Sequence, residues 1–123
     1  MKVAVVYGSV RAKRVGIRAA YFIRNQLKKR KHTVTLIDPL KEKLPLLDKM
    51  YKEFPKGNAP KTMRKLARIF KRVDACIIVS AEYNHCIPPA LSNLIDHFME
   101  EYFWKPAGIV SYSVGGFGGV RAS

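Results

Sequence analysis

Three segments of the sequence combine small residues with side chains that can bind an anion or a flat ring. Ser9, Arg11 and Arg14 supply a hydroxyl and two guanidinium groups just after an apolar run. Guanidinium groups and the free amides of a helix start suit a phosphate. The segments Glu82 to His85 and Tyr112 to Gly119 add an aromatic ring, an imidazole and glycine-exposed amides. These groups predict a site for a planar, phosphorylated ligand.

The first segment differs from the motifs that bind larger nucleotides. No GK[ST] follows Gly8, as a Walker A loop requires, and the turn lacks the GxGxxG of dinucleotide-binding folds. A mononucleotide is therefore the better interpretation. The alternative is that Gly8 and Ser9 only turn the chain.

Apolar runs predict the strands that position these segments. We expect buried strands at Val3–Tyr7, His32–Asp38, Ala75–Ser80 and Ala107–Ser113. Helical patterns fill the intervals, and strands alternating with helices require parallel pairing through right-handed crossovers. The fold class is thus α/β, a doubly wound parallel sheet, in which ligands bind beyond the carboxyl ends of the strands.

Apolar residues at helical spacing predict three helices. Their expected buried stripes are Ala19, Phe22, Ile23 and Leu27 in the first, Met63, Leu66, Ala67 and Phe70 in the second, and Leu91, Leu94, Ile95, Phe98 and Tyr102 in the third. Pro88 and Pro89 suit the first turn of the third helix. The proline-rich segment from Pro39 to Pro60 predicts a long loop.

Composition bounds the class of protein. A chain of 123 residues with 48% apolar residues suits one domain with a packed core. It has no long uncharged apolar run and no signal-peptide layout, so we expect a cytoplasmic protein that does not contact membranes. Cys76 and Cys86 lack CxxC spacing, which predicts free thiols and no metal site.

The net charge of +14 is unevenly distributed. Residues 1–73 carry 21 Lys and Arg against 4 acids, whereas residues 74–123 carry 2 against 5. Such a basic region attracts nucleic acid or anionic cofactors without sequence preference. Because no nucleic-acid recognition motif accompanies it, nucleic-acid binding is the less favoured interpretation.

Sharper interpretations exist for several polar and aromatic residues. His85 and Cys86 could form a nucleophile and base, although sequence neighbours usually point apart. His85, Asp96 and His97 could bind a metal, but a histidine on a packed helix is more often structural. The aromatic residues from Tyr102 to Trp104 could form a cofactor box, yet helix-end packing or a subunit interface is commoner.

The same segments carry a family resemblance. The stretches "GSVRAKRVG", "EYNHCIPPALSNLIDHF" and "VSYSVGGFGGVRA" resemble the signature segments of the NADPH-dependent FMN reductases, flavodoxin-like quinone, azo and chromate reductases. The second is the most specific, with matches at Glu82, Tyr83, Asn84, Pro88, Leu91, Asn93, Ile95 and Asp96. The resemblance spans essentially the whole chain.

The resemblance implies a flavin site with no catalytic side chain of its own. The residues implied to bind FMN are Ser9, Arg11, Arg14, Val15, Gly16, Glu82, Tyr83, Asn84, His85, Tyr112, Ser113, Gly115 and Gly116. The first five would hold the phosphate, the next four would border the isoalloxazine ring, and the last four would face its pyrimidine edge.

The implied activity is that of an FMN-dependent NAD(P)H oxidoreductase. Hydride would pass from NADPH or NADH through FMN to a small acceptor, namely a quinone, free flavin, azo compound or metal oxyanion, with ping-pong kinetics. The resemblance also implies a homodimer or homotetramer. The alternative is a non-catalytic flavodoxin-like module that binds flavin, nucleic acid or a protein through its basic surface.

The end of the chain departs from the family pattern. Members continue past "GGVRA" with a helix, a fifth strand and a closing helix. We therefore expect residues 1–123 to form a single FMN-binding domain that lacks its C-terminal part. The fourth strand would then be an unprotected edge.

Overall fold

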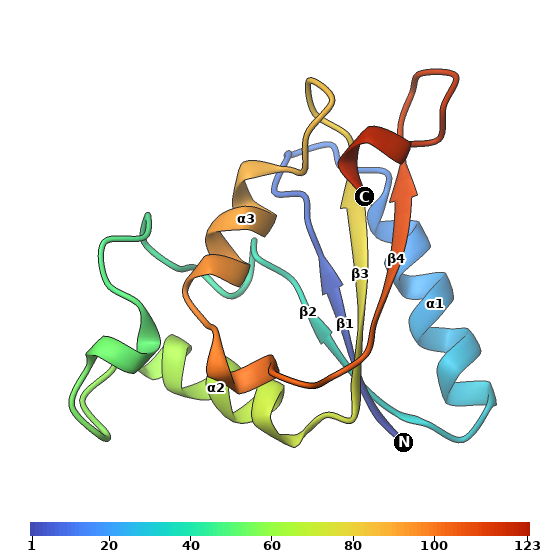
Figure 1. Ribbon diagram of the computed structural model, residues 1–123. Coiled ribbons are helices and arrows are strands. Elements are labelled where there is room, and N and C mark those ends of the chain that lie inside the picture. Colours follow the sequence, from blue (N-terminus) through green and yellow to red (C-terminus); the bar gives the residue numbers. More distant parts are fainter.

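Four strands form one parallel sheet in the computed structural model, which describes residues 1–123. The strands are β1 (Lys2–Tyr7), β2 (Thr33–Ile37), β3 (Ala75–Ala81) and β4 (Ala107–Tyr112), in the order β2-β1-β3-β4 (Figure 1). Every neighbouring pair is parallel. Because the chain crosses over between all strands, their carboxyl ends lie at one edge. The predicted α/β class is confirmed.

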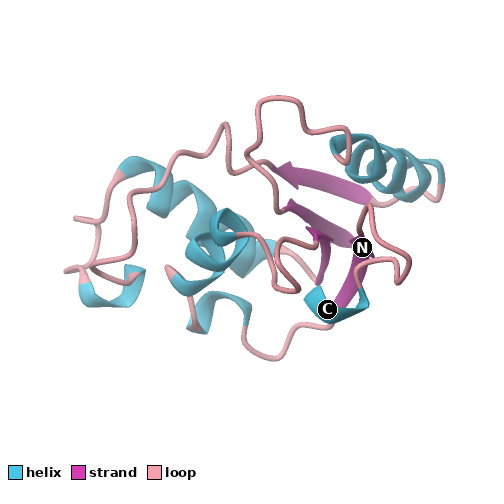
Figure 2. Cartoon of the chain, turned by 90° about the horizontal axis from the view of Figure 1, so that it is seen from above, coloured by secondary structure: helices cyan, strands magenta, loops and turns pink.

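Helices cover both faces of this sheet. The helices are α1 (Ile17–Lys29), α2 (Lys61–Arg72) and α3 (Pro89–Asp96), with single 3₁₀ turns η1 (Tyr51–Glu53), η2 (Glu100–Tyr102) and η3 (Val120–Ala122). Figure 2 shows α1 alone on one face, with α2 and α3 on the other. None of these helices has the length and apolar character needed to cross a membrane.

The larger part of the core lies between the sheet and α2 and α3. Met63, Leu66 and Phe70 of α2 and Leu91 and Leu94 of α3 are at most 3% exposed. Each such side chain contributes about 1.5 to 3 kcal/mol when fully buried. The predicted apolar stripe of α2 is therefore confirmed, and it fixes which face of the helix is left for its charged residues.

The stripe predicted for α1 is wrong at one position. Phe22 is 63% exposed, whereas Ala20 is fully buried. At about 100° per residue, two positions separate Phe22 from Ala20 by roughly 200°, so both cannot face the sheet. Ile23 and Leu27 pack against the core beneath α1 as expected.

The third helix is shorter than its predicted stripe. It ends at Asp96, and Tyr102 lies in η2. The Tyr102 hydroxyl donates a hydrogen bond to the Phe98 carbonyl at 2.8 Å, which packs η2 back onto the end of α3. Trp104 is fully exposed, so it encloses nothing in this structure.

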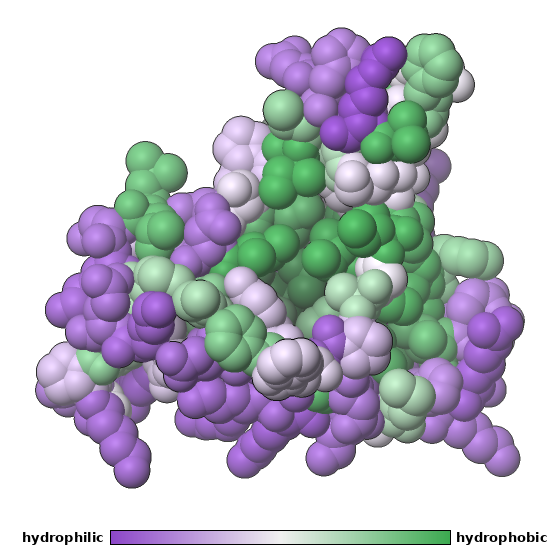
Figure 3. Space-filling view, in the orientation of Figure 1, coloured by the Kyte–Doolittle hydropathy of each residue, from purple (hydrophilic) through white to green (hydrophobic).

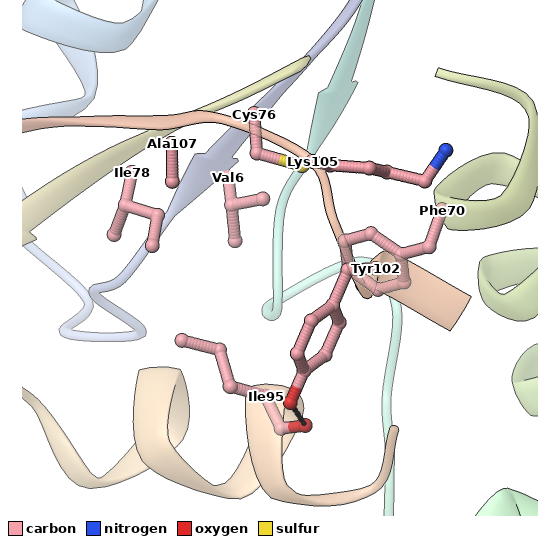
Figure 4. Close-up of a pocket in the computed structure, with 8 residues that line it drawn as sticks. All are labelled: Val6, Phe70, Cys76, Ile78, Ile95, Tyr102, Lys105 and Ala107. Atoms are coloured by element: carbon pink, nitrogen blue, oxygen red, sulfur yellow. Dashed lines mark hydrogen bonds between the residues drawn. The ribbon is translucent and has the colours of Figure 1, made fainter. Parts of the chain in front are cut away.

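Strand β4 is an exposed edge. Its Ile109 is 53% exposed, and Figure 3 shows apolar side chains reaching the surface in a hollow beside it. A pocket of about 180 Å³ lies there, lined by Val6, Phe70, Cys76, Ile78, Ile95, Tyr102, Lys105 and Ala107 (Figure 4). The Lys105 ammonium donates to the Lys71 and Val73 carbonyls, so the pocket wall is almost entirely apolar.

Candidate functional site

The loops that follow β1, β3 and β4 meet in one open pocket at the carboxyl ends of the strands. It has a volume of about 500 Å³ and is lined by Arg11, Lys13, Val15, Gly16, Arg18, Ala19, Ala81, Glu82, Tyr83, Tyr112, Ser113 and Val114. Seven of these are among the thirteen predicted flavin contacts. The structure thus brings the three polar segments together, as parallel strands require.

Ser9 ties the first loop to the second. Its side chain is buried, and its hydroxyl shares a hydrogen bond of 2.6 Å with the Tyr83 hydroxyl. The backbone amide of Arg11 also approaches the Ser9 oxygen, at 3.4 Å. A small buried hydroxyl therefore fixes the distance between the β1–α1 loop and the β3–α3 loop.

Arg14 is turned toward β2 and does not line the pocket. Its guanidinium donates to both carboxylate oxygens of Asp38, at 2.5 and 2.6 Å, and to the Ser9 carbonyl at 2.8 Å. Burial opposes ionisation of Asp38, but the hydrogen bonds from Arg14 and the Leu40 amide outweigh it, so the pKa of Asp38 is lowered. Arg14 therefore shapes the loop while its charge is already paired.

Three other cations remain available to an anion in the pocket. Arg11, Lys13 and Arg18 line it and form no ion pair. Only Arg11 was predicted from the sequence. Lys13 and Arg18 could have been found, because they sit in the same loop and first helical turn, where the helix dipole also favours negative charge.

Tyr112 forms the wall beside the start of α1. Its hydroxyl shares a 3.0 Å hydrogen bond with the buried hydroxyl of Tyr7. Burial and this hydrogen bond raise the pKa of Tyr112 well above its usual range, so the phenol stays neutral. A Cβ on Gly16 would lie 2.1 Å from the Tyr112 ring, so any larger residue there has to displace that ring. Sequence reasoning missed Tyr7, which looks like an ordinary strand residue.

The segment after β3 is a tight hairpin at the rim of the pocket. Tyr83 and Cys86 exchange two backbone hydrogen bonds of 2.9 and 3.0 Å, and Asn84 and His85 both have positive φ, 50° and 63°. Two left-handed residues between paired positions define a type I′ turn. The side chains of Asn84 and His85 therefore stand at the rim, outside the lining of the pocket.

Glu82 joins this hairpin to the last loop. Its amide donates to the Tyr112 carbonyl at 3.0 Å, and its carboxylate accepts from the Arg121 amide at 3.3 Å. The Arg121 guanidinium lies 3.0 Å from His85 Nδ1. The third loop is thereby held to the second through Glu82, a residue whose side chain is only 11% exposed.

Two glycines after β4 were predicted to face the flavin ring. Gly115 and Gly116 are exposed and do not line the pocket. The close backbone approach occurs at Gly119, whose φ is 83° and whose Cβ would lie 2.8 Å from the Tyr112 amide nitrogen. In the sequence, four glycines in five positions cannot be ranked; only the turn geometry distinguishes them.

The remaining candidates do not gather into a site. Cys86 is exposed and Cys76 is buried, and burial raises the pKa of the Cys76 thiol. No group of three or more His, Cys, Asp or Glu side chains is placed to hold a metal ion. His97 is fully buried against α3, with Nδ1 at 2.6 Å from the Asn93 carbonyl. The Asn93 side chain anchors the long loop through the Leu47 amide and the Pro45 carbonyl.

The pocket fits a flavin mononucleotide. Its volume lies within the usual range for small-ligand sites. Arg11, Lys13 and Arg18 concentrate positive charge near the start of α1, where a phosphate would also meet backbone amides. Tyr83 and Tyr112 supply ring surface in the wall of the same pocket. An anionic group and a flat aromatic group therefore both find matching partners among the lining residues.

Comparison with known proteins gives one family. Residues 1–123 match the model of the family described as NADPH-dependent FMN reductase. The chain is 32% identical over 135 aligned positions to the NAD(P)H-dependent FMN reductase LOT6 of Saccharomyces cerevisiae, covering all of this chain and 70% of LOT6. It is 29% identical to the NAD(P)H-dependent FMN reductase ntnL of Nectria sp, covering 99% of this chain and 63% of ntnL.

Solved structures share the fold at lower identity. The flavoenzyme FerB of Paracoccus denitrificans, an NAD(P)H:(acceptor) oxidoreductase, superimposes with a TM-score of 0.76 at 22% identity, over 98% of this chain and 65% of FerB. A flavodoxin from Pseudomonas aeruginosa gives 0.57 at 17% identity, over 97% of this chain and 68% of the flavodoxin. The chain thus spans about two thirds of the length of these relatives. On its sequence and its fold together, the chain belongs to the NADPH-dependent FMN reductase family.

Proposed function

We propose that this chain binds FMN in the pocket at the carboxyl ends of its strands and uses it as an NAD(P)H-dependent oxidoreductase. The observation that supports this most directly is the convergence of three loops on one pocket that is lined both by free cations and by tyrosine rings. Family membership adds the expected cofactor pair, FMN and NAD(P)H.

The protein's own groups would bind and orient the ligand. Arg11, Lys13 and Arg18 would neutralise the phosphate, while Ser9 keeps the loop at a fixed distance from Tyr83. The neutral Tyr112 phenol and the backbone after β4 would border the ring system. No acid–base pair would be needed, because FMN held by these residues would supply the redox chemistry, the transfer of a hydride from the nicotinamide.

We further propose that the acceptor is a quinone or similarly small oxidant. Two electrons and two protons would convert a quinone to a hydroquinone, with the second proton taken from water. Because nicotinamide and acceptor would use the same open side of the pocket in turn, ping-pong kinetics follow. The initial rate is measured against NADPH or NADH at several fixed concentrations of a benzoquinone. Parallel lines in the double-reciprocal plots would support ping-pong kinetics, and intersecting lines would refute them.

Flavin binding itself is tested with Arg11→Ala and the matched control Arg24→Ala. Arg24 lies on α1 outside the pocket, so the control removes the same charge elsewhere. We expect FMN to bind Arg11→Ala about tenfold or more weakly, because a charge-assisted hydrogen bond to phosphate is lost. The titration follows flavin fluorescence. Equal affinities for both variants, or no binding by the unmodified chain, would overturn the site.

Assembly and location complete the proposal. We propose a homodimer or homotetramer, supported by the exposed apolar side chains of Phe103, Trp104, Ile109 and Val110 near one edge of the sheet. Light scattering after size exclusion tests it, and a monomer at working concentration would refute it. We also propose a cytoplasmic location, which the two free thiols support and which cell fractionation tests.

A further inference from the structure

Helix α2 presents a fully basic outer face. It contains six Lys and Arg among twelve residues and no acid. Lys65 is paired with Glu42 and Lys71 with Glu101, but Arg64, Arg68 and Arg72 form no ion pair and are exposed. These three arginines follow one another at intervals of four residues, about 6 Å along the helix. They form one row on the surface.

Folding does not account for this row. Like charges four residues apart destabilise a helix. The helix dipole favours cations only in the last turn, which explains Lys71 and Arg72 but not Arg64 or Arg68. The apolar face of α2 is already buried in the core and would be so with any polar residue outside. An unpaired row that opposes helix stability indicates a partner that carries negative charge.

Two shallow grooves flank the row. One, of about 340 Å³, is lined by Tyr51, Arg64, Ala67, Arg68, Lys71 and Arg72. The other, of about 280 Å³, is lined by Lys2, Thr33, Thr35, Arg68, Ile69, Arg72 and Val73. No acidic side chain lines either groove. Arg68 and Arg72 border both, so a strand-like anion could follow the ridge between them.

This surface is remote from the flavin pocket. Lys2 is the first residue of β1, Thr33 is the first of β2, and Val73 precedes β3, so the second groove lies at the amino ends of the strands. The flavin loops follow the carboxyl ends of the strands. The six residues of β1 separate the two by about 20 Å. In Figure 1, α2 accordingly lies low in the view, on the side of the amino ends of the strands and away from the arrowheads. Attraction of FMN or NADPH to its own site therefore does not explain the row.

The shape of the surface favours nucleic acid over a membrane. An interfacial helix inserts an apolar face into the bilayer, but Met63, Leu66 and Phe70 of α2 are buried against the sheet. A phosphodiester chain needs only regularly placed cations, hydroxyl groups and an aromatic surface. The arginine row, Thr33, Thr35 and the partly exposed Tyr51 supply these.

We propose that the row Arg64, Arg68 and Arg72, with Lys2 and the threonines of β2, binds the backbone of nucleic acid without base specificity. Binding requires no flavin and leaves the flavin pocket free. With four cations engaged, the logarithm of affinity for a single strand falls with the logarithm of salt concentration with a slope of about −3. Binding is similar for oligonucleotides of different base sequence.

The test compares Arg68→Glu with Lys29→Glu by fluorescence anisotropy. Labelled RNA and DNA strands of about 20 nucleotides, which exceed a typical single-domain site, are titrated between about 50 and 200 mM salt. Both variants change the net charge equally, but Lys29 lies on α1, on the other face of the sheet (Figure 2). We expect Arg68→Glu to weaken binding about tenfold and to flatten the salt slope by about 0.7, the share of one cation on a single strand. Because salt screens distant charges, the affinity of Lys29→Glu should stay within about twofold of that of the original chain.

Melting temperature separates this role from a structural one. The carboxylate introduced by Arg68→Glu would stand between Arg64 and Arg72, so the variant is expected to melt at or above the temperature of the original chain while losing binding. An equal loss of oligonucleotide affinity in both variants would show that binding depends only on net charge, and it would overturn the proposal. Binding to anionic phospholipid vesicles but not to oligonucleotides would also overturn it, as would no binding at the lowest salt. None of these outcomes depends on flavin content.

Discussion

The two ends of the sheet differ in whether buried hydrogen bonds support their charged groups. At the carboxyl ends, the buried polar groups are paired within the protein, Arg14 with Asp38, Ser9 with Tyr83 and Tyr7 with Tyr112, and this frame carries the unpaired cations of the pocket. At the amino ends, the arginines of α2 stand exposed without partners. The first arrangement fixes distances between loops, whereas the second only accumulates positive potential.

This difference predicts different sensitivities. A site held by buried hydrogen bonds is sensitive to a small added side chain or to protonation of one member, because each group depends on the position of its neighbour. A surface of mobile, solvated cations tolerates shape changes and responds to charge and salt. Substitutions at matched positions of the two ends can therefore distinguish the hydrogen-bonded site from the exposed cationic surface.

The largest effect is expected at Gly16. Because a Cβ there would lie 2.1 Å from the Tyr112 ring, Gly16→Ala should destabilise the fold by about 3 kcal/mol through overpacking and displace the wall of the flavin pocket. Urea unfolding measures the loss. Thr33→Ala, at the exposed amino end, should cost less than about 0.5 kcal/mol.

Tyr112→Leu provides the check on this explanation. It removes the ring atoms that the new methyl group would meet, so the double variant should recover much of the stability lost by Gly16→Ala. Additive losses in the double variant would show that Gly16 is needed for another reason.

The sequence was sufficient for the fold because its signals are local. Apolar runs located all four strands within one or two residues, and the buried face of α2 follows from its spacing alone. The positions of the three loops follow from parallel topology. What could not be predicted depends on tertiary contacts: the rotation of α1 that exposes Phe22, the short α3, and the choice of Gly119 as the glycine of closest approach.

The chemistry of the pocket was predictable only in part, for a related reason. Residue type marked Arg11, Tyr83 and Tyr112, all of which line it. Residue type also marked Arg14, but its pairing with Asp38 joins residues 24 positions apart and is invisible in the sequence. A charged side chain in a binding loop can serve the loop as readily as the ligand, and only its partners decide between the two.

The next effect concerns that pairing and its pH dependence. Asp38→Asn should cost about 2 kcal/mol at neutral pH, because two charge-assisted hydrogen bonds are weakened. Since the folded-state pKa of Asp38 is lowered, the carboxylate stabilises the fold above its unfolded pKa, and this contribution is lost as pH falls through the lower folded value. The difference between the two chains should therefore shrink below about pH 4.

Glu42→Gln is the matched control for this prediction. The Glu42–Lys65 pair also joins a carboxylate to a cation, but the Lys65 side chain is 55% exposed against 12% for Arg14. Exposed pairs contribute about 0 to 1 kcal/mol. Unfolding between about pH 3 and 7 distinguishes them, and similar losses in both variants would remove the distinction between the two pairs.

The smallest effect uses a left-handed residue at each end of the sheet. Lys31 has a φ of 62° and closes α1 in a Schellman motif, with its amide on the Lys28 carbonyl and the His32 amide on the Leu27 carbonyl. His85 has a φ of 63° in the type I′ turn of the flavin pocket. Glycine adopts this conformation without the Cβ penalty, so Lys31→Gly and His85→Gly should each stabilise the fold by about 0.5 to 1 kcal/mol.

The two variants should differ in function. His85→Gly removes the side chain beside Arg121 and Glu82 and should weaken FMN retention, whereas Lys31→Gly should leave FMN retention unchanged. Thermal unfolding and flavin titration on the same samples measure both quantities, and equal retention in the two variants would show that the contacts of His85 with Arg121 and Glu82 do not support the flavin site.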